Sequence, residues 1–64
     1  MPMIRVEMFE GRSDEQKRAL VDKLTDAFVE AAGGSRDAVD VILYDVPKAN
    51  WGIGGALAKD KYPD

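Results

Sequence analysis

The sequence predicts an α+β fold, a single β-α-β unit whose two strands run parallel. Residues 2–9 alternate apolar and charged side chains, residues 14–32 place apolar side chains at helical spacing, and residues 39–46 form a β-branched apolar run. Because no further connection fits between these segments, the two strands are expected to be parallel with a right-handed crossover. We expect one domain, residues 1–64.

The first strand is predicted from strict alternation. Ile4, Val6 and Met8 share one face, and the residues between them are charged. Such alternation is typical of a strand with one buried face.

The helix is predicted from its two ends. Ser13 and Gln16 form a capping box, in which each side chain satisfies the backbone N–H of the other residue. Gly33 follows the last residue at helical spacing and is suited to the left-handed cap that ends a helix. We therefore expect the helix over residues 14–32.

The second strand, residues 39–46, is apolar on both faces. One face is expected to pack on the helix and the other against something outside this chain. Pro47 ends the strand. Residues 52–55, Gly-Ile-Gly-Gly, suit a tight turn or a short hairpin, and the polar tail from Lys59 is expected to fray.

Composition limits the functions that the chain can perform. Its 64 residues contain no Cys and no His, so neither disulfides nor the usual zinc sites are expected, and self-association remains as the means of stabilising so small a core. The net charge is −3 with scattered basic residues, unlike a nucleic-acid binder. With no apolar run of membrane-spanning length and no visible signal peptide, we expect no membrane partner and a cytoplasmic location.

The chain terminus is the most unusual candidate for acid–base chemistry. Without His and Cys, this work falls to Asp, Glu, Lys, Tyr or the terminal amine. Pro2 is small enough to permit removal of Met1, which would expose a secondary amine at the start of a strand. A neutral amine is a competent general base. The alternative is that Pro2 is merely a common second residue.

Two further candidates flank the helix and the hairpin. Arg12 lies in the loop before the helix, where its fork of donors can hold a carboxylate, although a solvated arginine is the simpler interpretation. Trp51 is either a pocket wall or a packing anchor between subunits.

Together these residues resemble the 4-oxalocrotonate tautomerase family. The matching pieces are Met1-Pro2, the run from Glu10 to Lys17, and Trp51-Gly52-Ile53-Gly54-Gly55. The resemblance covers nearly the whole chain and implies a C-terminal hairpin and a hexamer, a trimer of dimers. It implies a keto-enol isomerase acting on a small enol or 2-oxo acid, with no cofactor and no metal.

The resemblance also implies roles for individual residues. Pro2 would be the general base, and Arg12 would reach a substrate carboxylate in the site of a neighbouring subunit. Trp51 and Ile53 would line the substrate pocket, and the aromatic ring would lower the pKa of the amine.

The sequence departs from the family at Asp40, where many members carry a second arginine. A carboxylate there would repel an anionic substrate, and whether Arg36 reaches in instead is open. Hydration or dehalogenation of unsaturated acids, with Asp40 or Asp45 activating water, is an alternative activity. A further alternative is a non-catalytic subunit of a mixed hexamer.

Overall fold

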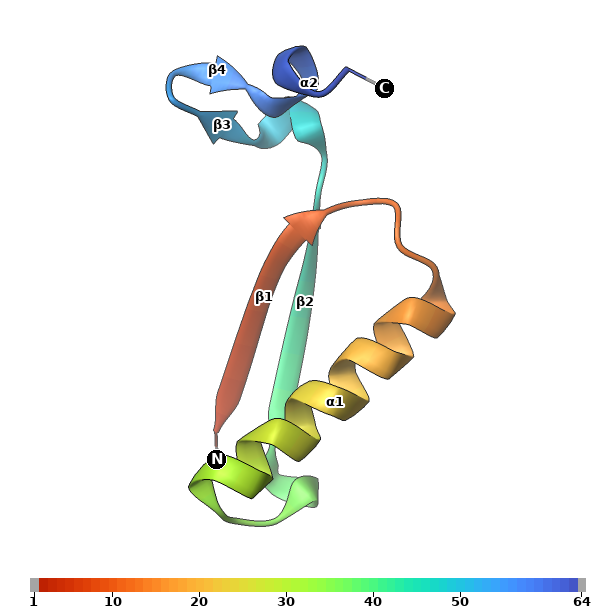
Figure 1. Ribbon diagram of the computed structural model, residues 1–64, viewed down its shortest axis with the longest axis vertical. Coiled ribbons are helices and arrows are strands. Elements are labelled where there is room, and N and C mark those ends of the chain that lie inside the picture. Colours follow the sequence, from red (N-terminus) through yellow and green to blue (C-terminus); the bar gives the residue numbers. More distant parts are fainter. Residues whose placement is uncertain (1, 64) are drawn as a thin grey trace.

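The computed structural model describes residues 2–63 and contains the predicted β-α-β unit (Figure 1). Strand β1 (Met3–Phe9) leads into helix α1 (Asp14–Ala32), and strand β2 (Asp40–Val46) returns beside β1. The strands are parallel, with Met3 paired to Asp40 and Phe9 paired to Val46. The predicted α+β fold is confirmed, and each strand begins one residue later than predicted.

Helix α1 begins and ends where the sequence predicts. The Ser13 hydroxyl accepts from the Gln16 amide at 3.1 Å, and the Gln16 side chain accepts from the Ser13 amide at 2.9 Å. At the other end Gly33 has a φ of 84°, and its N–H donates to the Val29 carbonyl at 2.9 Å. Glycine adopts positive φ without steric cost, so the helix stops at this residue.

The glycine-rich segment forms the predicted short hairpin. Strand β3 (Gly52–Ile53) pairs antiparallel with strand β4 (Ala56–Leu57). Gly54 and Gly55 connect them with φ values of 58° and 88°. Two consecutive positive φ values fit a two-residue hairpin turn, which matches the twist of the strands.

The prediction of a frayed tail was wrong. Helix α2 (Ala58–Lys61) follows β4, and Ala58 is fully buried. The Ala58 amide donates to the Trp51 carbonyl at 2.7 Å, and the Lys48 ammonium donates to the Tyr62 carbonyl at 3.1 Å. The tail folds back on the 3-10 turn at Lys48–Asn50, a long-range contact that local composition does not reveal.

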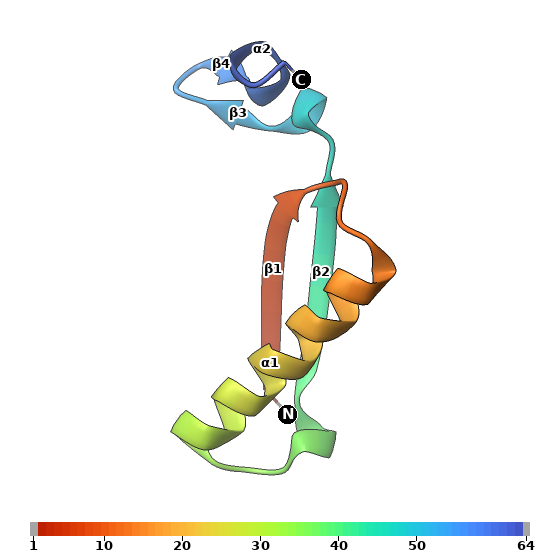
Figure 2. The same ribbon diagram turned by 45° about the vertical axis from the view of Figure 1, so that its right-hand side comes forward.

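The single chain is open and poorly buried. Its apolar core among the described residues is limited to Met8 and Ala58, and its surface of 4780 Å² exceeds the roughly 4,000 Å² of a compact protein of this mass. The radius of gyration is 14.7 Å, against about 11 Å for a compact chain of this length. Figure 2 shows the cause, because the hairpin and α2 stand beyond the ends of β1 and β2.

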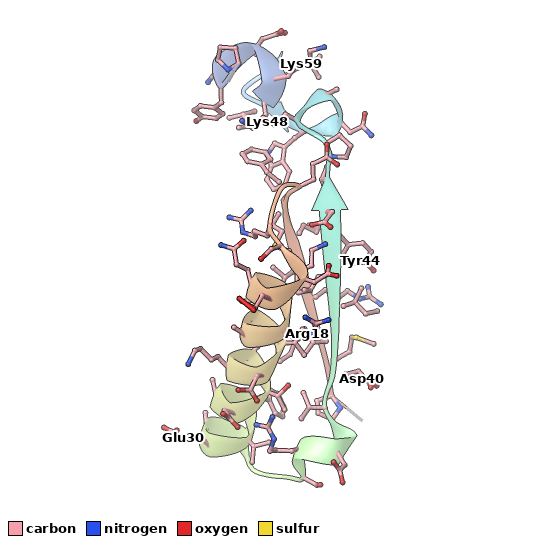
Figure 3. All side chains as sticks on the ribbon, turned by 90° about the vertical axis from the view of Figure 1, so that its right-hand side faces the viewer. Arg18, Glu30, Asp40, Tyr44, Lys48 and Lys59 are labelled. Atoms are coloured by element: carbon pink, nitrogen blue, oxygen red, sulfur yellow. The ribbon has the colours of Figure 1, made fainter. Side chains whose placement is uncertain are left out.

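The sheet has one covered face and one open face. Ile4, Val6 and Met8 lie on the covered face of β1, and they share one face as predicted. Asp40 and Tyr44 point away from α1 (Figure 3). Three large apolar side chains are exposed on this open face: Met3, Ile42 and Tyr44, at 44%, 36% and 40%. The expectation that the second strand is apolar on both faces is therefore confirmed, and one of those faces is uncovered in the single chain.

Candidate active site

Pro2 lies at the N-terminal end of β1 and is half-buried. Its carbonyl accepts from the Asp40 amide at 3.0 Å, the first bond between the two strands. This bond fixes the backbone of Pro2, and with it the position of the Pro2 nitrogen, at one end of the sheet. Removal of Met1 concerns a residue outside the described part of the chain.

Arg12 lies beyond the opposite end of β1, in the exposed loop before α1. Its Nη1 donates to the Phe9 carbonyl at 2.9 Å. A guanidinium carries five N–H donors, so this one bond leaves most of the fork able to bind a carboxylate.

Trp51 and Ile53 lie at the same end of the sheet as Arg12. The Trp51 ring packs edge-on against Phe9, with ring centroids 4.5 Å apart and an interplanar angle of 63°. Ile53 follows in β3 and is half-buried. Trp51 is therefore a packing residue within its own chain as well as a candidate pocket wall.

Phe9 joins these candidates, and the sequence analysis did not single it out. The Phe9 carbonyl accepts a hydrogen bond from Arg12, and the Phe9 ring packs against the Trp51 ring. A signal was present in the sequence. Phe9 is apolar but falls on the face of β1 that carries Arg5 and Glu7, where alternation alone predicts a polar residue.

One protomer does not bring Pro2 together with the other candidate site residues. The seven residues of β1 separate Pro2 from Arg12, and a strand of that length spans about 20 Å. The side chain of Arg12 is far shorter than this distance. A site that uses both residues must therefore combine residues from two protomers.

Two of the hollows on the surface of the described chain can be compared with the predicted site residues. The smaller, about 250 Å³, lies where β2 meets the hairpin, beside Trp51 and Glu7. The larger, about 490 Å³, runs along α1 and contains none of the predicted site residues. The smaller hollow is therefore the one that coincides with a predicted pocket residue.

Asp40 lies at the Pro2 end of the sheet, where its amide binds the Pro2 carbonyl. The Asp40 side chain is exposed and has no ion-pair or hydrogen-bond partner among residues 2–63. Arg36 does not approach it, because its guanidinium binds Asp22 of α1 at 2.8 Å and also binds Asp26.

The described residues contain no group of three or more potential metal ligands. No helix among them is long and apolar enough to cross a membrane.

Solved structures define the class of this chain. A 4-oxalocrotonate tautomerase isozyme from Methylibium petroleiphilum is 50% identical, with a TM-score of 0.85 over 91% of this chain and 94% of that chain. A heterohexamer 4-oxalocrotonate tautomerase from Chloroflexus aurantiacus is 35% identical, with a TM-score of 0.88 over 94% and 97%. The fold is thus that of the small 4-oxalocrotonate tautomerase subunit.

Sequence comparison identifies the family itself. The pattern of the tautomerase enzyme family matches residues 2–61. A 2-hydroxymuconate tautomerase from Comamonas testosteroni is 52% identical over 60 residues, which cover 94% of this chain and 95% of that protein. The chain belongs to the tautomerase family. It is an isomerase of the tautomerase type, as the resemblance in the sequence implied.

Proposed function

We propose that this tautomerase uses the amine of processed Pro2 as its general base, in a site that is completed by a second copy of the chain. The single observation that carries the proposal is the separation of Pro2 from Arg12 by the length of β1. Arg12 of one protomer would hold the carboxylate of a small enol or 2-oxo acid, and Pro2 of another would move the proton.

The chemistry requires a neutral amine in a fixed position. Once Met1 is removed, the Pro2 nitrogen accepts the proton of the enol oxygen, so the O–H bond breaks and the C=C double bond is replaced by a C=O double bond. The protonated amine then returns the proton to carbon as a new C–H bond, which restores the neutral amine. The backbone bond from Asp40 to the Pro2 carbonyl holds this nitrogen at the sheet end. No acidic residue among residues 2–63 is buried in the single protomer, so none of them is a buried alternative base with a pKa raised by desolvation.

Assembly is supported by the surface that one chain leaves uncovered. Met3, Ile42 and Tyr44 are exposed on the open sheet face, and Leu57 of the hairpin is 42% exposed. Burial of such apolar area is the main driving force of association. A homohexamer, a trimer of dimers, is the assembly we propose.

The substrate that we propose is a small acid, and the charge of Asp40 affects whether a monoacid or a diacid binds better. The relative from Comamonas testosteroni is a 2-hydroxymuconate tautomerase, whose name identifies a diacid. In this chain the exposed Asp40 carboxylate lies at the Pro2 end, where it would repel a second negative charge. We therefore favour a monoacid enol.

Hydration or dehalogenation of an unsaturated acid is the second candidate activity. Asp45 is a poor candidate for activating water, because its carboxylate is already bound to Lys17. Asp40 lies at the correct end and has no side-chain partner among residues 2–63. Release of halide from haloacrylates, lost in Asp40→Asn, would favour this activity over proton transfer.

Subunit mixing tests the shared site. Pro2→Ala and Arg12→Ala homo-oligomers are each expected to turn over phenylenolpyruvate slowly. Oligomers reassembled from equal amounts of the two variants should regain about one quarter of wild-type activity, the fraction of sites that pair an intact Pro2 with an intact Arg12 under random assembly. If mixing restores nothing although native mass spectrometry finds mixed oligomers, the two residues do not share an intersubunit site.

The same mass measurement addresses the mixed-hexamer alternative. A stable, active homohexamer supports the proposal. An inactive or dissociated homomer would instead indicate that a different partner chain is required, as in the heterohexamer from Chloroflexus aurantiacus.

A further inference from the structure

An ion pair ties the first turn of α1 to the end of β2. Lys17 Nζ lies 2.5 Å from Asp45 Oδ2, and the two side chains are 30% and 33% exposed. The hydrogen bond to Asp45 raises the pKa of Lys17, because it stabilises the ammonium form. This shift favours the charged form of Lys17, which is the form that pairs with Asp45.

This ion pair connects the two segments that flank the loop that carries Arg12, residues 10–13. On one side, the Glu10 amide donates to the Val46 carbonyl at 3.2 Å, directly after Asp45 in the chain. On the other side, the Lys17 amide donates to the Ser13 carbonyl at 3.0 Å, within the first turn of α1. The Lys17–Asp45 pair links the end of β2 to the first turn of α1. It therefore fixes the distance between the two ends of the loop formed by residues 10–13.

The position of Arg12 depends on these flanking contacts, because its own side chain makes few contacts that orient it. Its loop is exposed, and the bond from its guanidinium to the Phe9 carbonyl is its one side-chain bond among residues 2–63. A long side chain held by one bond loses much of its binding advantage if its backbone shifts, because productive geometry tolerates little displacement.

We propose that the Lys17–Asp45 pair positions Arg12 for binding the substrate carboxylate. The inference rests on the proposed role of Arg12 and extends it. Lys17 and Asp45 act through the loop and do not touch the substrate. Partly exposed ion pairs contribute little to stability, so removal of the pair should change substrate binding more than folding.

The chain offers a matched control at the other end of α1. Arg36 binds both Asp22 and Asp26, and this cluster ties α1 to the segment before β2. Asp26→Asn removes one carboxylate from that cluster in the same way that Asp45→Asn removes one from the Lys17 pair. Because Asp22 still holds Arg36 and Arg12 is distant, Asp26→Asn should leave the kinetics unchanged.

The test is a set of kinetic measurements on the processed full chain with phenylenolpyruvate as the probe. Asp45→Asn should raise KM by about 3- to 10-fold with a smaller change in kcat, a partial loss of what Arg12 supplies. Asp45→Glu, which keeps the charge, should recover most of the affinity. Lys17→Met should repeat the change in KM and replaces Asp45→Asn if that variant does not assemble.

A double variant separates positioning from a general effect. If Asp45 acts through Arg12, adding Asp45→Asn to Arg12→Ala should cause no further loss. Wild-type kinetics in both Asp45→Asn and Lys17→Met, or an equal loss in the Arg12→Ala background, would overturn the inference while leaving the role of Arg12 intact. Wild-type kinetics in Arg12→Ala alone would overturn the proposed role of Arg12 and this inference with it.

Discussion

Asp40→Arg is expected to raise kcat/KM for 2-hydroxymuconate. The substitution alters a side chain only, so the backbone bond from residue 40 to the Pro2 carbonyl remains. The Asp40 carboxylate is exposed and has no partner among residues 2–63, so no existing ion pair is lost when its charge is reversed. The experiment therefore measures the interaction of residue 40 with the substrate.

The expected size of the change in kcat/KM follows from the exposure of the Asp40 side chain. An exposed unit charge about 4 Å from a substrate carboxylate interacts with it by about 1 kcal/mol in water. Reversal from repulsion to attraction changes the barrier by about 2 kcal/mol, which corresponds to about 30-fold in kcat/KM. Asp40→Asn removes only the repulsion and should give about 5-fold. If the new guanidinium also reaches the developing oxyanion, the gain should rise toward about 100-fold.

The assay compares initial rates of wild type, Asp40→Asn and Asp40→Arg on the diacid at one pH. The gains should shrink at high salt, because screening weakens interactions between exposed charges. Phenylenolpyruvate, whose single carboxylate Arg12 can hold, should gain less and serves as the control substrate. Rapid turnover of the diacid by wild type, with a loss in Asp40→Arg, would refute the reasoning and assign Asp40 a positive role.

Three other predictions concern the α1 end of the site and the helix itself. Arg12→Ala should lower kcat/KM on acid substrates by about 10- to 150-fold, the loss of one charge-assisted contact; unchanged kinetics would make Arg12 a solvated loop residue. Ser13→Ala should reduce the free energy of unfolding by about 1 kcal/mol through loss of the helix cap, measured by denaturant titration. Because the pKa of Lys17 is raised in the folded state, its pair with Asp45 should stabilise the fold below the ordinary lysine pKa of 10.5 and lose this effect as pH rises through the folded-state pKa. Thermal scans against pH should show this loss in wild type and not in Asp45→Asn.

Local signals predicted most of the fold. The capping box at Ser13 and the glycine at position 33 determined both ends of α1, because each satisfies backbone groups within a few residues. The parallel pairing of β1 and β2 followed from the length of the chain between them. The helix ends depend on residues that are close in the sequence, and the strand direction depends on the length of the connection, so both could be recognised without a structure.

Long-range contacts were not predictable in the same way. The burial of Ala58 depends on the hairpin folding back onto the 3-10 turn, and the binding of Arg36 to Asp22 and Asp26 depends on the angle of α1. The link from Phe9 to Trp51 likewise joins two segments far apart in the chain. The candidate site was identified as a set of residues, but its division between the two ends of β1 became visible only in the folded chain.

The most direct test of the central claim is the activity of one protein sample before and after removal of Met1. With Met1 present, the Pro2 nitrogen is a tertiary amide and has no proton-accepting lone pair of useful basicity. Treatment with methionine aminopeptidase, followed by intact mass, converts it to a free secondary amine without any change to the rest of the chain. We predict that turnover of phenylenolpyruvate rises strongly in step with the fraction of chains that have lost Met1. Equal turnover by the unprocessed and processed chains would contradict the account and place the catalytic base elsewhere.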